Sequence, residues 1–167
     1  TGNQITLSAW VKSTADQNDD AGIVIKNVGS IYNYNLNVQS NERGNFRVTT
    51  PSKETYITGA TDLQQDQWYF LYGIYNGATA KVYLNSIEDG SDTNSGNILS
   101  TTEPVLIGRR AIGDNRFFEG TIDEVRISST ARSTDWMTTE YNNQQYPDKA
   151  VHGNDGFFTL GSEEEAP

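Results

Sequence analysis

The chain has 167 residues, which is long enough for one domain with a two-layer core. Its 22 Asp and Glu residues outnumber 12 Lys and Arg, and the net charge of -10 disfavours nucleic acid and anionic lipid surfaces as partners. No apolar run approaches the length of a membrane span, so we expect no direct membrane insertion. Cysteine is absent and gives no information on the redox compartment. Neutral or cationic partners fit this composition best.

Short apolar stretches separated by turn residues predict a succession of β-strands. The expected strands cover about 4–12, 22–26, 31–39, 45–50, 55–58, 67–75, 79–85, 104–109 and 117–127. Residues 41–45 and 75–80 are predicted as hairpin loops, and 88–96 as a longer polar loop. Residues 156–164 are compatible with a last edge strand.

One late helix is predicted, with Ser133 as its N-cap and Asp135 in the first turn. Many short strands followed by a single helix predict an all-β fold, a two-sheet antiparallel β-sandwich or jelly roll. Period-two alternation then predicts which side chains face the core. The residues expected to be buried between the sheets are Leu7, Val11, Leu36, Val82, Leu84, Val125 and Ile127.

The strand at 31–39 shows this alternation most clearly. One row is predicted to be core and contains Tyr32, Tyr34, Leu36 and Val38. The other row is predicted to be exposed and contains Asn33, Asn35, Asn37 and Gln39. In the first strand, Trp10 lies on the side opposite Leu7 and Val11, so its ring is expected to face solvent or a groove. The strand at 67–75 is apolar on both sides, which is typical of a central strand.

Several segments, in this order, carry a resemblance to a known family. They are "ITLSAWVK", "QWYFLYGIYNG", "AKVYLN", "VLIGRR", "FEGTIDEVRIS" and "STDWMTTEYNNQ". The set resembles laminin-G-like, concanavalin A-like jelly-roll domains of bacterial or archaeal multidomain surface proteins. The resemblance implies one such domain over residues 1–160, with 161–167 as an acidic tail or linker. It also implies a module that is usually non-catalytic, extracellular and used to bind glycans or other surface ligands.

Catalytic signatures are weak in this sequence. Some relatives hydrolyse glycans with carboxylates that alternate on one strand, because retaining hydrolysis needs two carboxyl groups roughly 5 Å apart. Here Asp123 and Glu124 are adjacent in sequence and so project to opposite faces. The single histidine, His152, lies in a polar segment and is read as a solvated loop residue. We therefore expect no enzymatic activity.

Asp123 lies on the buried parity of an otherwise apolar strand, and two interpretations remain open. A buried carboxylate needs hydrogen-bond donors or a cation. In similar jelly-roll modules the Asp of this strand commonly helps to hold a structural calcium ion, so Asp123 is a candidate calcium ligand. Alternatively, Asp123 caps neighbouring backbone amides at a strand end. Asp16, Asp19 and Asp20 form a second acidic group, for which an ordinary solvated loop is the favoured reading.

Glycan binding requires flat aromatic faces for sugar rings, and amides or guanidinium groups for their hydroxyls. Trp10 and Tyr75 are the predicted aromatic ligand residues, and Arg109 or Arg110 the predicted guanidinium group. The predicted amides are Asn33, Asn35 and Asn37. For each residue the competing reading is plain packing or a solvated sheet face.

The sequence therefore predicts a carbohydrate-binding or adhesion module of a larger exported protein, extracellular or at the cell surface. Its expected partners are a glycan or another cell-surface ligand and the other domains of the parent chain. The alternative is a structural spacer or protein-interaction domain without a small ligand. An aromatic-bearing groove on one sheet would favour the first function, and a flat polar face the second.

Overall fold

The computed structural model describes residues 2–29, 31–110 and 116–145. The chain divides into two compact units, Thr1–Arg132 and Ser133–Pro167. In the described residues, all strands belong to the first unit and the helix belongs to the second.

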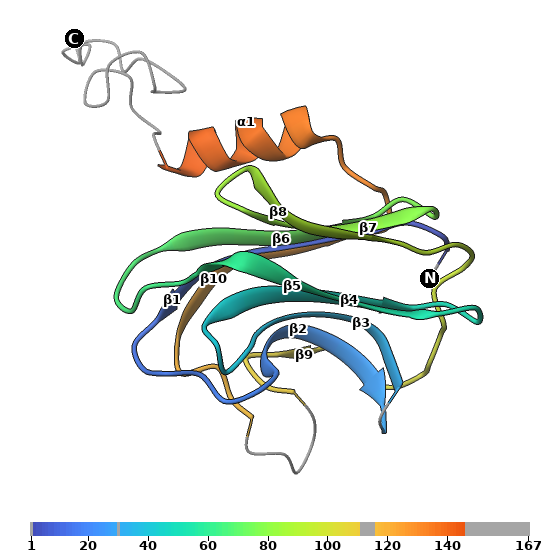
Figure 1. Ribbon diagram of the computed structural model, residues 1–167, viewed down its shortest axis with the longest axis horizontal. Coiled ribbons are helices and arrows are strands. Elements are labelled where there is room, and N and C mark those ends of the chain that lie inside the picture. Colours follow the sequence, from blue (N-terminus) through green and yellow to red (C-terminus); the bar gives the residue numbers. More distant parts are fainter. Residues whose placement is uncertain (1, 30, 111–115, 146–167) are drawn as a thin grey trace, which may run out of the picture. The chain divides into compact units, whose positions relative to one another are not determined.

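The first unit is built from two antiparallel five-stranded sheets that lie face to face (Figure 1). Sheet A has the order β10-β1-β6-β7-β8 and sheet B the order β5-β4-β3-β2-β9, which is a β-sandwich as predicted. The strands of sheet A are β1 (Ile5–Ser13), β6 (Tyr69–Tyr75), β7 (Thr79–Leu84), β8 (Ile87–Thr93) and β10 (Gly120–Ser128). The strands of sheet B are β2 (Ala21–Val28), β3 (Ile31–Val38), β4 (Arg43–Thr49), β5 (Glu54–Asp62) and β9 (Leu106–Ile107).

The hydrophobic core lies between the two sheets. Of the residues predicted to be buried, Leu7, Val11, Leu36, Val82 and Leu84 are all in it. Strand β6 is central in sheet A, as its two apolar faces predicted. At Gly73 of this strand a Cβ atom would lie only 2.2 Å from Cδ2 of Phe46 in sheet B. A glycine at this position lets the Phe46 ring reach across the core.

Strand β8 was missed, because most of its residues were predicted as a polar loop. It is an edge strand that pairs only with β7, and its side chains are exposed or half-buried, so no apolar alternation marks it. The preceding turn has positive φ at both Asn85 and Ser86, 48° and 71°. Such a two-residue turn suits a hairpin, but its sequence lacks the usual Asn-Gly signal.

A β-bulge in β3 changes which side chains face the core. Lys26 of β2 pairs with Tyr34 and Asn27 pairs with Tyr32, so Asn33 is an extra residue in β3. Tyr34 belongs to the core cluster, whereas the Tyr32 ring lies against the guanidinium group of Arg47. Tyr32 is buried as predicted, but it lies on the outer side of sheet B and not in the core cluster, because the bulge breaks the alternation.

A second bulge alters the strand that contains Asp123. Ser8 of β1 pairs with Arg126, but Trp10 pairs with Asp123, so two β10 residues lie opposite Ala9. Glu124 takes up the extra length with a φ of 51°. Asp123 is exposed, and the prediction that it shares the buried parity is wrong.

The same edge of the sandwich leaves two predicted core residues outside the core. Val125 packs against the core but is only partly buried. Ile127 is 46% exposed, so its predicted burial is wrong. Strand β10 is an edge strand of sheet A and has a neighbouring strand, β1, on one edge only. In sheet B, Ile107 of the edge strand β9 is also exposed.

The second unit contains α1 (Thr134–Gln145). Its predicted N-cap is confirmed, because the backbone N of Trp136 donates to Oγ of Ser133 over 3.2 Å. Asp135 lies in the first turn, where a negative charge favours the helix dipole. The predictions for His152, for a strand at 156–164 and for a tail at 161–167 fall outside the described residues.

Candidate functional site

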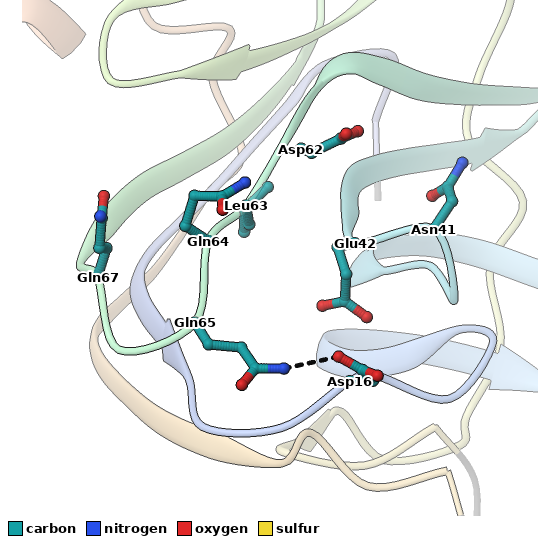
Figure 2. A pocket seen from close by; sticks show the side chains of 8 residues that line it. All are labelled: Asp16, Asn41, Glu42, Asp62, Leu63, Gln64, Gln65 and Gln67. Atoms are coloured by element: carbon teal, nitrogen blue, oxygen red, sulfur yellow. Dashed lines mark hydrogen bonds between the residues drawn. The ribbon is translucent and has the colours of Figure 1, made fainter.

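A polar pocket lies where three strand connections of the first unit meet (Figure 2). Its volume is about 510 Å³, within the range of small-molecule sites. The connections are those between β1 and β2, between β3 and β4, and between β5 and β6. The lining residues are Asp16, Asn41, Glu42, Asp62, Leu63, Gln64, Gln65 and Gln67.

Hydrogen bonds tie the three connections to one another. The backbone N of Gln17 donates to Oε1 of Glu42 over 2.6 Å, and the backbone N of Leu63 donates to the Glu42 carbonyl over 2.7 Å. The backbone N of Asp66 donates to the Ser13 carbonyl over 2.8 Å. Glu42 is thus the central residue of this frame. These bonds fix the backbone of the three connections, whereas most of the lining side chains are exposed.

Two carboxylates face each other across part of the pocket. Oδ1 of Asp16 accepts a hydrogen bond of 2.6 Å from Nε2 of Gln65, and the Glu42 carboxylate points toward this pair (Figure 2). Oε2 of Glu42 is buried and has no hydrogen-bond partner among the described residues. Burial raises the pKa of the Glu42 carboxyl, the bond from Gln17 opposes this, and the Asp16 charge raises the pKa further.

The third carboxylate of the pocket has a basic partner outside it. Nε of Arg43 donates to Oδ1 of Asp62 over 2.7 Å. None of the eight lining residues is Lys, Arg or His. Four amide residues and Leu63 complete the lining of the pocket. The four amides can both donate and accept hydrogen bonds. The chemistry of the pocket suits a ligand with several hydroxyl or amino groups.

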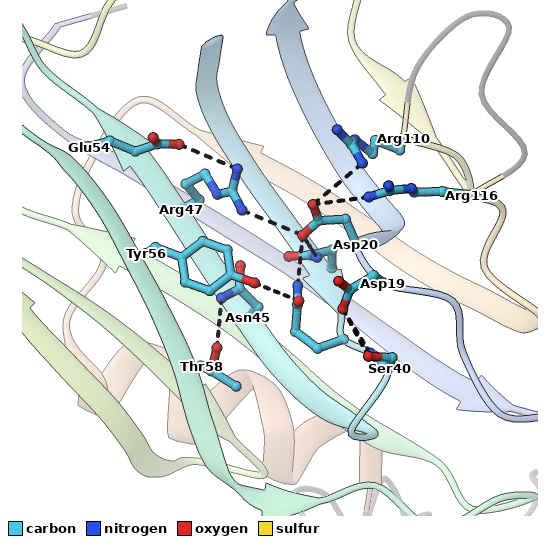
Figure 3. Close-up of polar contacts among 12 residues, drawn as sticks. Asp19, Asp20, Ser40, Asn45, Arg47, Glu54, Tyr56, Thr58, Arg110 and Arg116 are labelled. Carbon is cyan, nitrogen blue, oxygen red and sulfur yellow. Dashed lines mark hydrogen bonds and ion pairs between the residues drawn. The ribbon is translucent and has the colours of Figure 1, made fainter. Parts of the chain in front are cut away.

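A second polar cluster covers the outer face of sheet B, the face that points away from the core (Figure 3). Its centre is Asp20, whose Oδ1 accepts hydrogen bonds from Nδ2 of Asn37 over 2.9 Å and from Nε2 of Gln39 over 2.8 Å. Nη2 of Arg47 lies 3.5 Å from the same oxygen. The Arg47 guanidinium also lies 4.0 Å from the centroid of the Tyr32 ring.

The segment after β9 contributes two more cations to this cluster. Nη1 of Arg110 lies 3.7 Å from Oδ2 of Asp20, and Nη1 of Arg116 lies 3.6 Å from it. Gly22 of β2 permits this approach, because a Cβ there would lie 2.5 Å from the carbonyl carbon of Arg109. The favoured reading of Asp20 as part of a solvated acidic loop is therefore wrong. Its side chain is largely buried among guanidinium groups.

The structure brings three of the predicted ligand residues, Asn35, Asn37 and Arg110, to this face of sheet B. The predicted exposure of the Asn row is wrong, since Asn35 and Asn37 are 0% exposed beneath the polar cluster. Asn33 is also buried, and its Nδ2 donates to the Leu99 carbonyl over 2.7 Å. These amides offer almost no surface to a ligand in this conformation. The cluster instead holds the Arg110 segment on the sheet.

The two aromatic residues predicted to bind a ligand are buried. Trp10 does lie on the outer side of sheet A, but it is only 7% exposed. Its ring packs against the Phe70 ring, with 5.4 Å between the two ring centroids. Tyr75 is in the core cluster, and its hydroxyl donates to the Gly96 carbonyl over 2.8 Å. Neither ring presents a free face to a sugar. The exposure expected for Trp10 was wrong because a period of two predicts the side of a strand and not what covers that side, whereas Tyr75 lies on the core side of β6.

Asp123 follows the second of its two predicted roles in this structure. Its Oδ1 accepts a hydrogen bond of 2.8 Å from the backbone N of Glu124, which is a cap of a neighbouring amide. Among the described residues no three His, Cys, Asp or Glu side chains come together as a metal-binding group. A calcium shell takes six to eight oxygens, which carboxylates, backbone carbonyls and water can supply. Calcium binding stays a prediction.

The residues of the pocket were not predicted as a site, apart from Asp16 in the acidic loop. A signal was present in "DLQQDQW" at 62–68, a segment rich in amides and carboxylates that connects two predicted strands. Such a segment looks like any polar loop until its neighbours are known. The sequence marks Glu42 only as part of a predicted hairpin loop. In the structure this residue adopts a φ of 60°.

A sandwich of two antiparallel sheets is an architecture that lectin domains share with other β-proteins. The chain belongs to the concanavalin A-like lectin/glucanases superfamily, whose laminin G family model matches residues 1–137. The resemblance noted in the sequence is thereby confirmed. No curated protein matches the chain.

Several solved structures share the fold at low sequence identity. A candidate carbohydrate binding protein from Bacteroides ovatus matches with a TM-score of 0.68 and 16% identity, over 81% of this chain and 40% of its own. Domain 4 of AbnA matches with a TM-score of 0.63 and 21% identity, over 83% of this chain and 66% of its own. AbnA is an extracellular GH43 arabinanase from Geobacillus stearothermophilus, and this domain was solved in complex with arabinotriose. A pentraxin from Limulus polyphemus matches with a TM-score of 0.64 and 19% identity, over 84% of this chain and 70% of its own.

These structural matches establish the fold. The chain spans 40% of the length of the Bacteroides protein. In the described residues, the helix is neither long nor apolar enough to cross a membrane.

Proposed function

We propose that this chain is a non-catalytic carbohydrate-binding module and that the pocket formed by Asp16, Asn41, Glu42 and Gln65 is its sugar site. One observation carries the proposal. An open surface pocket of about 510 Å³ is lined mainly by carboxamide and carboxylate groups on a hydrogen-bonded frame. Such groups can form paired hydrogen bonds with vicinal hydroxyls, which is one of the two requirements for binding a sugar, and none of the eight lining residues supplies an aromatic face.

The comparisons support a carbohydrate ligand in general. The Bacteroides protein is described as carbohydrate binding, and the arabinanase domain was solved with arabinotriose. Both are similar to this chain in fold, and both chains are longer than the matched part. We therefore also propose that the module works outside the cell or at its surface, as one part of a larger exported protein.

The sugar site can be tested by a screen on a glycan array followed by calorimetric titration of the sugars that bind. Gln65→Ala should weaken binding about 3- to 10-fold, because one direct hydrogen bond is worth about 1 kcal/mol. Asn97→Ala is the matched control, since Asn97 is an exposed amide that does not line the pocket. Equal binding by both variants would place the sugar elsewhere on the molecule.

The same measurements address the alternative of a spacer or protein-interaction domain. A spacer should bind no glycan on the array at millimolar sugar concentration. Incubation of any bound oligosaccharide with the protein, followed by product analysis, tests the non-catalytic part. Release of shorter sugars would show a hydrolase.

A further inference from the structure

We infer that the pocket prefers sugars that carry a free amino group, that is, amino sugars without an N-acetyl group. This inference rests on the proposed function and adds the ligand class. The geometry points to it through three features: the charge of the pocket wall, the state of the Glu42 carboxylate, and the arrangement of the acceptors around it.

The wall of the pocket is negatively charged and has no cation of its own. Three of its residues, Asp16, Glu42 and Asp62, carry carboxylates, and none is basic. Asp62 is neutralised from outside by Arg43. Asp16 and Glu42 then remain as two like charges in one pocket, and the Asp16 charge disfavours the ionised form of Glu42. A cation between them relieves this repulsion, whereas the carboxylate of a uronic acid increases it.

Glu42 supplies negative charge. Its Oε1 is held by the backbone N of Gln17, and its Oε2 is buried without a hydrogen-bond partner among the described residues. Because Oε2 offers almost no surface in this conformation, the carboxylate acts on a ligand in the pocket through its charge, which an ammonium group compensates. A hydroxyl and an N-acetyl group carry no charge, and the N-acetyl group also adds bulk.

The remaining acceptors suit an ammonium group, which has three donors. Gln65 donates its amide to Asp16 and so orients its own carbonyl oxygen and the Asp16 carboxylate together (Figure 2). Asp16, Glu42 and Gln65 come from three different strand connections. The amides of Asn41, Gln64 and Gln67 are left for the hydroxyls of the same sugar.

The test compares three trisaccharides by titration calorimetry at one pH and salt concentration: β-1,4-linked glucosamine, its fully N-acetylated form, and a galacturonic acid trimer. The glucosamine trimer should bind at least about 10-fold more tightly than the acetylated one, which corresponds to about 1.4 kcal/mol. The galacturonic acid trimer should bind most weakly.

Two variants locate the effect. Glu42→Gln keeps an oxygen that can accept the hydrogen bond from the backbone N of Gln17, and it removes the charge. The preference for the glucosamine trimer over the acetylated trimer should therefore fall to about 2-fold or less. Glu103→Gln removes the same charge from an exposed position outside the pocket, and its preference should equal that of the unchanged protein. This control separates the pocket from the overall charge of -10. A thermal melt of each variant confirms that it is folded.

The outcomes separate the two proposals. If the acetylated trimer binds as tightly as glucosamine, or if Glu42→Gln keeps the preference, the inference is overturned and a sugar site remains. If Glu103→Gln loses the preference as Glu42→Gln does, net charge is the cause and the inference is again overturned. If the array and the trimers show no sugar binding at all, both the inference and the proposed function fail.

Discussion

Oε1 of Glu42 accepts a hydrogen bond of 2.6 Å from the backbone N of Gln17, and this bond joins the β3–β4 turn to the β1–β2 connection. Gln17 is itself fixed on the other side, where its side-chain amide exchanges two hydrogen bonds with the backbone of Glu119. The geometry of the pocket therefore depends on contacts between segments that are 25 and 102 residues apart.

The stability of the protein should depend on pH through Glu42. Burial raises the pKa of its carboxyl, with a further contribution from Asp16. The folded state therefore holds the proton more tightly than the unfolded state. The stabilisation is present below the unfolded pKa and is lost as the pH rises through the folded pKa. As the pH rises above about 4, the unchanged protein should lose stability relative to Glu42→Gln.

Urea unfolding of both proteins at several pH values measures this difference. Glu103→Gln serves as the control for removing an exposed carboxylate. A difference between the Glu42→Gln variant and the unchanged protein that stays constant over the whole range would show that Glu42 titrates alike in both states.

Asp20→Asn should destabilise the fold by about 1–3 kcal/mol, because three guanidinium groups lose their shared counter-charge. Asn is the cleanest replacement, since it keeps the shape and tolerates the φ of 57° at this position. Asp19→Asn, next to it in the chain, removes an exposed carboxylate that bonds to Ser40 and should cost less than about 1 kcal/mol. Equal losses for the two variants in urea unfolding would contradict the buried role of Asp20.

Trp10→Ala should lower the free energy of unfolding by about 3–5 kcal/mol, because the ring is buried against Phe70. Trp68→Ala is the matched control. Its ring is 41% exposed and lies under the ammonium group of Lys12 at 5.4 Å, so its loss should cost about 1 kcal/mol or less. Chemical denaturation measures both. A stable Trp10→Ala protein with weakened glycan binding would restore Trp10 as a ligand residue.

Calcium should affect the unchanged protein and Asp123→Asn alike. An ion that binds only the folded state raises the melting temperature by mass action. Asp123 is exposed, and its Oδ1 is bonded to the neighbouring backbone N of Glu124. Melting curves with millimolar calcium and with a chelator check this. A calcium response that disappears only in Asp123→Asn would establish the ion site that the sequence suggested.

Local pattern was sufficient for the sandwich itself. Alternation with a period of two identified most strands and the core positions Leu7, Leu36 and Val82, because burial of one face of a strand leaves a direct mark on every second residue. The N-cap at Ser133 could be predicted for the same reason, since the cap bonds within its own helix turn. The edge strand β8 left no such mark, because neither of its faces is fully buried.

Tertiary structure decided which polar residues meet. The bulges at Asn33 and Glu124 moved Tyr32 and Asp123 to other faces, and one extra residue in a strand has no reliable signature in a single sequence. Asn35 could be placed on the outer side of its strand, but it is buried there beside Arg47, which lies opposite it in β4. The pocket unites three connections whose polar residues look like separate solvated loops in the sequence. Only the packing of the two sheets brings Asp16, Glu42 and Gln65 together, because proximity in space across so many residues is set by the register and order of the strands.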